Sequence, residues 1–523
     1  MVFSARAQEN RYMIFFKDKT GTPYYINQPS EFLSQRAIAR RAKQNIAIAE
    51  EDLPVNPAYI NQLKTAGATV LYSSRWFNAA LVEVTPSEKI TIQTLNFVQS
   101  VEYAAPGKNG TGGRQAQNLA AQTTGTTSLA NTTQFNMLGL DNMVNDGLTG
   151  NGVFIAVLDA GFTGVNNQQP FNHIFANNKL VDHYNFAYGN TNVFGYDDHG
   201  TQVLSTIAAE SENYSSGATD ATFMLYVTEH VPTEFRVEEY LWAFAAERAD
   251  SVGADIISSS LGYSEFDDAA MDYTYSDLDG GHAAISKAAQ FAFERGIVVV
   301  NSAGNRYVGS DWSRITPPAD GPNVLAVGSV DASQVHAPSS LLGPNALNVI
   351  KPDVMGMGAG AVVVNGNGTV TNSNGTSFSC PQVASLVAGV WQMNPALSAS
   401  QMLDLMRRAG SRYFNPDNTY GYGIPTYQAI KHILEFDPVG QGILLFPNPI
   451  QGNTIQIAIA PADGSTVWVR LSTLIGQSVY EQTYQANWHL NPFAVDVATL
   501  APGVYIAQVK SGTKSRTFRV VKP

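Results

Sequence analysis

The sequence predicts an α/β protein whose largest part folds as a doubly wound, mainly parallel β-sheet. Between residues 135 and 436, short apolar runs such as "GVFIAVLDAG", "ADIISSSLG" and "RGIVVVNSAGN" are bounded by glycine and polar turns. Helix-like stretches such as "GGHAAISKAAQFAFER" separate these runs, as crossover helices do in a parallel sheet. The chain has 523 residues, of which 44% are hydrophobic, so it is too long for one core and we expect further domains on either side.

Two segments are expected before this sheet. Residues 11–105 alternate strand-like runs such as "RYMIFF" with helix-like runs such as "SEFLSQRAIARRAKQ", which favours a small α+β domain. Residues 106–134 are rich in Gly, Thr, Gln and Asn with almost no large apolar side chain, which is typical of an exposed linker that a protease can cut. Residues 1–10 contain the small-residue pattern "ARA", so we expect a remnant of a signal region there.

The last part of the chain, residues 443–523, has the alternating pattern of β-strands. Segments such as "STVWVRLS", "GVYIAQVK" and "SRTFRVV" are separated by glycine turns. An all-β sandwich fits this pattern best.

Composition excludes several classes of partner. The formal net charge is −12 and the pI is about 5.1, which argues against nucleic acid or an anionic membrane, because both require a basic surface. The sequence has no run of about 18 apolar residues, so we expect no membrane span. Cys380 is the only cysteine, which excludes an intrachain disulfide and a zinc cluster built from several thiolates.

Three polar residues lie where hydrolytic chemistry is expected in such a sheet. Asp159 ends the apolar run "FIAVL", His199 lies in "DDHGTQV", and Ser377 opens the apolar helix "SFSCPQVASLVAGVWQM". Proline is tolerated only in the first turn of a helix, so Pro381 predicts that this helix begins near Ser377 to Ser379. Nucleophilic hydrolysis needs a hydroxyl, a base and a carboxylate that orients the base. Each residue taken alone is at least as often a cap or a structural group.

The segments around these three residues, taken together, indicate one class of hydrolase. "AVLDAGF", "DDHGTQV" and "NGTSFSCPQVA" closely resemble the three active-site motifs of the subtilisin-like serine proteases, and the order Asp, His, Ser is the order of that family. The segment "NSAGN", which ends at Asn305, resembles the family segment that carries the oxyanion asparagine. The segment "SSSLG" resembles the family strand that pairs with the substrate backbone. The resemblance covers roughly residues 135–436 and implies a serine endopeptidase that requires no cofactor.

The resemblance implies a role for each residue. Asp159 would orient His199, His199 would take the proton of Ser377, and Asn305 would stabilise the oxyanion. The primary substrate pocket would be lined by Ser260, Leu261, Gly262, Ala303 and Gly304. The two glycines suggest an open pocket. Gln202 and Phe378 stand where many family members have histidine and methionine, which affects the expected pocket shape but not the chemistry.

Other functions fit these residues less well. An esterase of α/β-hydrolase type would need a second glycine in "GTSFS" and a histidine after the serine, and neither is present. Cys380 lies within a buried helix beside a proline, where a free cysteine is usually part of the core. A non-catalytic binding or adhesion protein of the cell surface, built on the same scaffold, is the alternative from another class.

Both flanking domains also carry a resemblance. Residues 11–105 resemble the inhibitory propeptide of subtilases, which implies a zymogen that processes itself and is inhibited by its own propeptide. Residues 443–523, with "FPNPIQG", "LIGQSVYEQTY" and "LAPGVYIAQVKSGTKSRTFRVVK", resemble the C-terminal sorting domain of proteins exported by the type IX system of Bacteroidetes. This implies export through the periplasm to the cell surface or the medium, with the type IX machinery and peptide substrates as partners. A plain binding or accessory domain is the alternative for each.

No metal ligand is assigned from the sequence. Subtilases often bind structural Ca²⁺, and the acidic segment "EFDDAAMDYTYSDLDGG", residues 265–281, is a candidate for such a site. It is equally well a solvated acidic insertion, because its carboxylates show no recognisable loop spacing.

Overall fold

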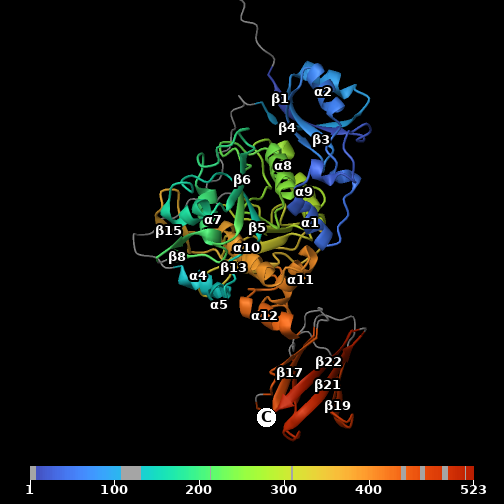
Figure 1. Cartoon of the computed structure of the whole chain (residues 1–523), viewed down its shortest axis with the longest axis vertical. Coiled ribbons are helices and arrows are strands. Elements are labelled where there is room, and N and C mark those ends of the chain that lie inside the picture. Colours follow the sequence, from blue (N-terminus) through green and yellow to red (C-terminus); the bar gives the residue numbers. More distant parts are fainter. Residues whose placement is uncertain are drawn as a thin grey trace, which may run out of the picture.

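A computed structural model describes most of the chain, with the N-terminal domain at the top of Figure 1 and the C-terminal domain at the bottom. The described residues are 8–107, 131–212, 214–307, 310–436, 443–450, 452–459, 466–485, 493–512 and 514–523. Most of the expected signal remnant and of the expected processing linker lies outside the described residues.

Seven parallel strands form the central sheet, in the order β13-β12-β11-β10-β5-β9-β6. The sheet runs through the middle of Figure 1, and its strands are β5 (Phe154–Asp159), β6 (Leu180–Asn185), β9 (Thr222–Val227), β10 (Ile256–Ser259), β11 (Val298–Ser302), β12 (Leu325–Val330) and β13 (Val354–Met357). The parallel, doubly wound fold predicted from the sequence is confirmed.

The two faces of β5 pack against different helices. Ile155 and Val157 share a core with α7 (His199–Ala208) and α10 (Thr376–Met393). Ala156 and Leu158 share a core with α8 (Val237–Val252) and α9 (Ala284–Glu294). A strand buried on both faces is apolar at every position, which explains the continuous run "FIAVL". Because side chains alternate along a strand, Asp159 at the end of β5 lies on the side of α7 and α10.

Shorter elements complete this domain. They are α4 (Thr132–Met137), α5 (Leu140–Asn145), α6 (Asn172–Ala176), β7 (Glu210–Ser211), β8 (Tyr214–Ser215), β14 (Ala361–Val364), β15 (Val370–Ser373), α11 (Ala399–Arg408) and α12 (Tyr427–Phe436). The antiparallel pair β14 and β15 leads directly into α10. Within the described ranges, no helix is long and apolar enough to cross a membrane.

The N-terminal domain is an antiparallel sheet with three helices. The strand order is β2-β3-β1-β4, with β1 (Asn10–Phe16), β2 (Thr69–Ser74), β3 (Ala79–Val84) and β4 (Val98–Pro106); the helices are α1 (Gln35–Lys43), α2 (Pro57–Thr65) and α3 (Pro86–Gln93). Met13, Trp76 and Leu81 of this domain belong to the same core as α8 and α9. The domain therefore covers the two helices on one side of the central sheet, as Figure 1 also shows.

A buried carboxylate of α8 holds this domain in place. Asp250 is fully buried, and its Oδ1 accepts a hydrogen bond from Arg40 Nη2 at 2.5 Å. Its Oδ2 accepts from Arg41 Nη2 at 2.6 Å and from Arg75 Nη2 at 2.5 Å. Burial would raise the pKa of Asp250, but the three guanidinium groups outweigh it and hold that pKa below its ordinary value.

Two further carboxylates extend this ion cluster. Asp52 pairs with Arg41 at 2.7 Å and with Arg295, at the end of α9, at 2.8 Å. Glu247 of α8 accepts a hydrogen bond from the backbone N–H of Arg75 at 3.0 Å. The contact between the two domains thus combines an apolar core with a set of buried ion pairs.

The C-terminal domain is a β-sandwich, as predicted. One sheet has the order β16-β17-β20 and the other has the order β19-β18-β21-β22. The strands are β16 (Ile443–Phe446), β17 (Thr454–Ile459), β18 (Thr466–Thr473), β19 (Ser478–Gln485), β20 (Phe493–Asp496), β21 (Gly503–Ser511) and β22 (Lys514–Lys522). Ile455 and Ile457 of the first sheet share one core with Val469 and Val509 of the second.

Candidate active site

A carboxylate and an imidazole meet at the carboxyl end of the central strand. Asp159 is the last residue of β5 and His199 is the first residue of α7, the helix on the same side of the sheet. His199 Nδ1 lies 2.7 Å from Asp159 Oδ1, which also accepts a hydrogen bond from the backbone N–H of Ala160 at 2.8 Å. Asp159 has no exposed surface, so this bond is shielded from water. The arrangement fixes one ring nitrogen of His199 and orients the other.

Three neighbouring carboxylates raise the pKa of His199. Burial would lower the pKa of His199, but Asp159, followed by Asp197 and Asp198, outweighs it and raises that pKa above its ordinary value. Asp197 Oδ1 also accepts the backbone N–H of His199 at 2.7 Å and so positions the start of α7. His199 Nε2 is buried and has no hydrogen-bond partner among the described residues. That nitrogen is therefore available to a reacting hydroxyl.

Ser377 lies at the start of α10, and its neighbour Phe378 lies beside the His199 ring. The rings of His199 and Phe378, the neighbour of Ser377, have centroids 5.7 Å apart. Ser377 Oγ donates to the carbonyl of Ser260 at 3.5 Å and makes no hydrogen bond to His199 within the described part of the chain. Catalytic hydrogen bonds are often long before substrate binds, so this geometry is compatible with a nucleophile that turns towards His199.

The start of α10 differs from the prediction. The helix begins at Thr376, before the predicted start at Ser377 to Ser379, and Pro381 lies beyond its first turn. A proline removes the hydrogen bond to the carbonyl four residues earlier, which is that of Ser377. Ser260 Oγ donates to this carbonyl at 2.8 Å and replaces the lost bond. The helix tolerates Pro381 because the neighbouring segment satisfies the carbonyl that proline leaves without a helical partner.

Asn305 is held against the same helix start. Its Oδ1 accepts hydrogen bonds from the backbone N–H of Thr376 at 2.9 Å and from the Thr376 hydroxyl at 3.1 Å. These two bonds define the orientation of the amide and leave its Nδ2 as the donor. Burial and, to a smaller extent, the charge of Glu234 raise the pKa of Tyr307 to about 12. A hydrogen bond to the Asn305 side chain partly opposes this rise.

The five predicted pocket residues lie at one edge of the sheet. Ser260, Leu261 and Gly262 follow β10, and Ala303 and Gly304 follow β11, the neighbouring parallel strand. The two glycines suggested open space, but Thr316 lies against both of them. Neither composition nor motif pointed to Thr316, which belongs to a distant turn of the chain.

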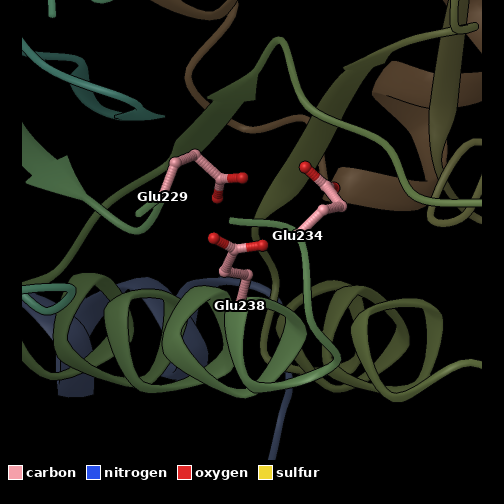
Figure 2. A group of neighbouring side chains, drawn as sticks. All are labelled: Glu229, Glu234 and Glu238. Atoms are coloured by element: carbon pink, nitrogen blue, oxygen red, sulfur yellow. The ribbon is translucent and has the colours of Figure 1, made fainter. Parts of the chain in front are cut away.

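A cluster of three glutamates lies near this site. Figure 2 shows Glu229, Glu234 and Glu238 pointing towards one another, and their carboxylate oxygens lie within 4.8 Å of each other. Burial raises the pKa of Glu229 to about 7; hydrogen bonds from Tyr263 and Thr228 oppose the rise and Asp159 adds to it. Burial and the neighbouring carboxylates raise the pKa values of Glu234 and Glu238 well above the ordinary value.

Carboxylate oxygens are the ligands that Ca²⁺ takes, but the cluster by itself falls short of a calcium site. Glu229 accepts a hydrogen bond from Tyr263 at 2.6 Å, and Glu238 accepts two backbone N–H groups, at 2.9 Å and 3.3 Å. Ca²⁺ takes about six to eight oxygens. Protons also compete for these carboxylates, because all three pKa values are raised.

The acidic segment 265–281 is an ordered loop that contributes no member to this cluster. Asp267, Asp268, Asp272, Asp277 and Asp279 each accept a hydrogen bond from a backbone N–H group of the loop or its neighbours. Four of these bonds lie within the segment, and Asp267 accepts the backbone N–H of Glu234, 33 residues away.

Comparisons with known proteins match each part of the chain. The model of the subtilase family matches residues 150–423, the model of the peptidase S8 propeptide domain of Bacteroidota matches residues 11–122, and the model of a secretion system C-terminal sorting domain matches residues 444–523. Subtilisin DY of Bacillus licheniformis is 26% identical over 287 residues, 55% of this chain and 93% of that protein. Subtilisin BL of Lederbergia lenta is 28% identical over 285 residues, 54% of this chain and 93% of that protein.

Among solved structures, MycP1 from Mycobacterium smegmatis is similar with a TM-score of 0.48 and 20% sequence identity, over 60% of this chain and 89% of that one.

Proposed function

Since the chain belongs to the subtilase family, with that family's N-terminal propeptide and a C-terminal secretion sorting domain, we propose that it is an exported serine endopeptidase made as a self-processing zymogen. The observation that carries the proposal is the 2.7 Å contact between Asp159 Oδ1 and His199 Nδ1 at the carboxyl end of β5. It leaves the second ring nitrogen without a partner in the described structure, beside the start of α10 where Ser377 lies.

In the proposed reaction Ser377 attacks the peptide carbonyl while His199 Nε2 takes the hydroxyl proton. Asp159 keeps the imidazole in the correct tautomer and stabilises the imidazolium that forms. His199 then gives its proton to the leaving amine, and water hydrolyses the acyl-enzyme by the same groups in reverse order. Apart from the substrate and the hydrolytic water, the proposed reaction uses only side-chain and backbone groups of this chain.

The oxyanion is stabilised at the start of α10. We assign Asn305 Nδ2 and the backbone N–H of Ser377 as its donors, because Thr376 fixes the Asn305 amide oxygen and so directs the amide nitrogen. The N-terminal end of a helix also favours a developing negative charge.

Peptide hydrolysis by two serine variants tests this assignment. Ser377→Ala is expected to lose all but a trace of activity towards a casein or peptide substrate. Ser379→Ala is the matched control: Ser379 lies on the same turn of α10, but its hydroxyl donates to the carbonyl of Thr376 at 3.0 Å, so this variant is expected to retain most activity. Equal activity of Ser377→Ala and the parent protein would contradict the role of Ser377 as the nucleophile. Absence of hydrolysis by the processed parent protein would favour a binding protein on the same scaffold.

Processing of the zymogen gives an independent test. If the chain cuts itself within residues 106–134, Ser377→Ala is expected to accumulate as the full chain with residues 11–105 attached. Normal processing of that variant would show that another protease matures the protein.

The C-terminal domain is proposed to direct export through the type IX system. Deletion of residues 443–523 is expected to retain the enzyme in the periplasm. Release of the truncated protein into the medium at the parent level would contradict the sorting role.

A further inference from the structure

The pocket expected beside Ser377 has two walls, and each wall contains a glycine. One wall is tied to α10 because Ser260 Oγ donates to the Ser377 carbonyl at 2.8 Å, and it ends at Gly262. The other wall contains Gly304 and is tied to the same helix because Thr376 N–H donates to Asn305 Oδ1 at 2.9 Å. Under the proposed function, the carbonyl of the P1 residue binds at Ser377 and Asn305, and its side chain enters the expected pocket between these two walls.

Thr316 occupies the space between these walls. Its Oγ1 lies 2.1 Å from the point that a Cβ on Gly262 would occupy, and 2.7 Å from the corresponding point on Gly304. Both distances are shorter than real Cβ contacts, so the two glycines make room for Thr316. They do not open the pocket.

Thr316 is held in this place by its neighbours. Its backbone N–H donates to the carbonyl of Ala303 at 3.2 Å, and the carbonyl of the next residue, Pro317, accepts from Tyr263 at 3.2 Å. Leu341 Cδ1 lies 2.9 Å from the Cβ point of Gly304. Thr316 is only 6% exposed, and its β-branched side chain has few rotamers to which it can move. A large P1 side chain therefore cannot displace it at low cost.

The Thr316 hydroxyl is a second reason to expect a small side chain in the pocket. Its Oγ1 is buried and has no hydrogen-bond partner among the described residues. A buried hydroxyl without a partner is costly, so a small polar group that enters the pocket gains a hydrogen bond there. The pocket thus suits a P1 side chain that is short and either apolar or hydroxylated.

The chain's own linker has the matching composition. Residues 108–130 contain 14 Gly, Ala, Ser or Thr residues among 23 and no aromatic residue, so most bonds in this segment follow a small side chain. A protease restricted to small P1 residues can therefore still process its own zymogen.

We propose that Thr316 determines the specificity of this protease and limits the P1 residue of its substrates to glycine, alanine, serine and threonine. The proposal rests on the proposed peptidase function and adds its substrate class.

The test compares the cleavage of peptides that are identical except for Ala, Ser, Leu or Phe at P1. The concentration of active sites in the processed enzyme is determined by titration with a fluorophosphonate. The parent enzyme is expected to cleave the Ala and Ser peptides with a kcat/KM at least about 100-fold above that for Phe, because even one methylene changes discrimination by about 10- to 200-fold. Thr316→Ala is expected to raise kcat/KM for Phe at least about tenfold and to leave that for Ala within about threefold.

Thr316→Val is the matched control, because valine keeps the shape of threonine and lacks only the hydroxyl. It is expected to exclude Phe as the parent does and to lose any preference for Ser over Ala. Mass mapping of the parent's own processing site is expected to show a cut after a small residue of 108–130, and this measurement needs no variant.

The outcomes distinguish the role of Thr316 from the peptidase function on which it rests. Efficient cleavage after Phe by the parent enzyme, or acceptance of Phe by Thr316→Val, would overturn the role of Thr316 while the peptidase function stands. A parent protein that neither reacts with the fluorophosphonate nor cleaves any peptide would overturn both.

Discussion

Neutralising Asp250 should loosen the N-terminal domain from the protease. Asp250→Asn keeps the shape of the side chain and removes the charge that Arg40, Arg41 and Arg75 share. Arg41 keeps its pair with Asp52, and Arg75 keeps the carbonyl of Glu247 at 3.1 Å. Removing one partner of a buried ion pair costs about 3–5 kcal/mol. The remaining partners put the expected loss at the lower end, about 3 kcal/mol, or a factor of about 10² in the docking equilibrium.

Hydrogen exchange in the full-length protein measures this loss locally. In a Ser377→Ala background, which avoids processing, the amides of α1 are expected to exchange about 10²-fold faster in Asp250→Asn, because α1 packs on α8. Asp182→Asn is the control: Asp182 pairs with Arg248 of the same helix α8, at 2.6 Å, and accepts a hydrogen bond from Tyr226, so the partners that it has among the described residues lie in the protease domain. Exchange of α1 in Asp250→Asn within about threefold of the parent would refute the view that the buried ion cluster stabilises docking.

Further expectations follow from the same contacts. Asn305→Ala should fold and bind substrate but lose about 10²–10³ in kcat, and a near-normal kcat would contradict its role as oxyanion donor. The pKa of His199 is raised by Asp159, so kcat/KM should fall as pH decreases through a value above 6.5, and Asp159→Asn should shift that limb to lower pH; an unshifted limb would contradict the pairing. Ser260→Ala should destabilise the protein by about 1–3 kcal/mol in denaturant titration, since the Ser377 carbonyl loses its partner, and an unchanged midpoint would contradict this. Asp250 has a pKa below its ordinary 3.8, so its contribution to docking is full above that pH and lost only in stronger acid. The difference in α1 exchange between Asp250→Asn and its parent should therefore persist at pH 5, and its disappearance there would contradict this.

The predicted site rested on signals that are local in sequence. An apolar run followed by Asp159 already places a carboxylate at the end of a buried strand, and glycine before Ser377 with an apolar run after it places a hydroxyl at a helix start. The parallel sheet was likewise predictable, because strands buried on both faces are apolar at every position. The pairing of Asp159 with His199 was implied by the resemblance to the subtilase motifs, and the structure places the two side chains in contact.

Other features depend on contacts between distant segments and left no local signal. Thr316 belongs to a turn that only the folded chain brings between Gly262 and Gly304. Arg40 and Arg41 lie in a segment that was predicted only as a helix, and no local pattern indicated that both are buried against Asp250. The position of Pro381 beyond the first turn of α10 was not predicted, because the hydroxyl that compensates for it comes from Ser260, more than a hundred residues away.

The central claim is that Ser377 is a nucleophile activated by the Asp159–His199 pair. Mass mapping of a fluorophosphonate adduct on the processed protein tests it most directly. The adduct is expected on Ser377 alone, with a rate that falls as His199 becomes protonated and with no adduct in His199→Ala. An adduct on another serine, or equal labelling of Ser377 in His199→Ala, would contradict the claim.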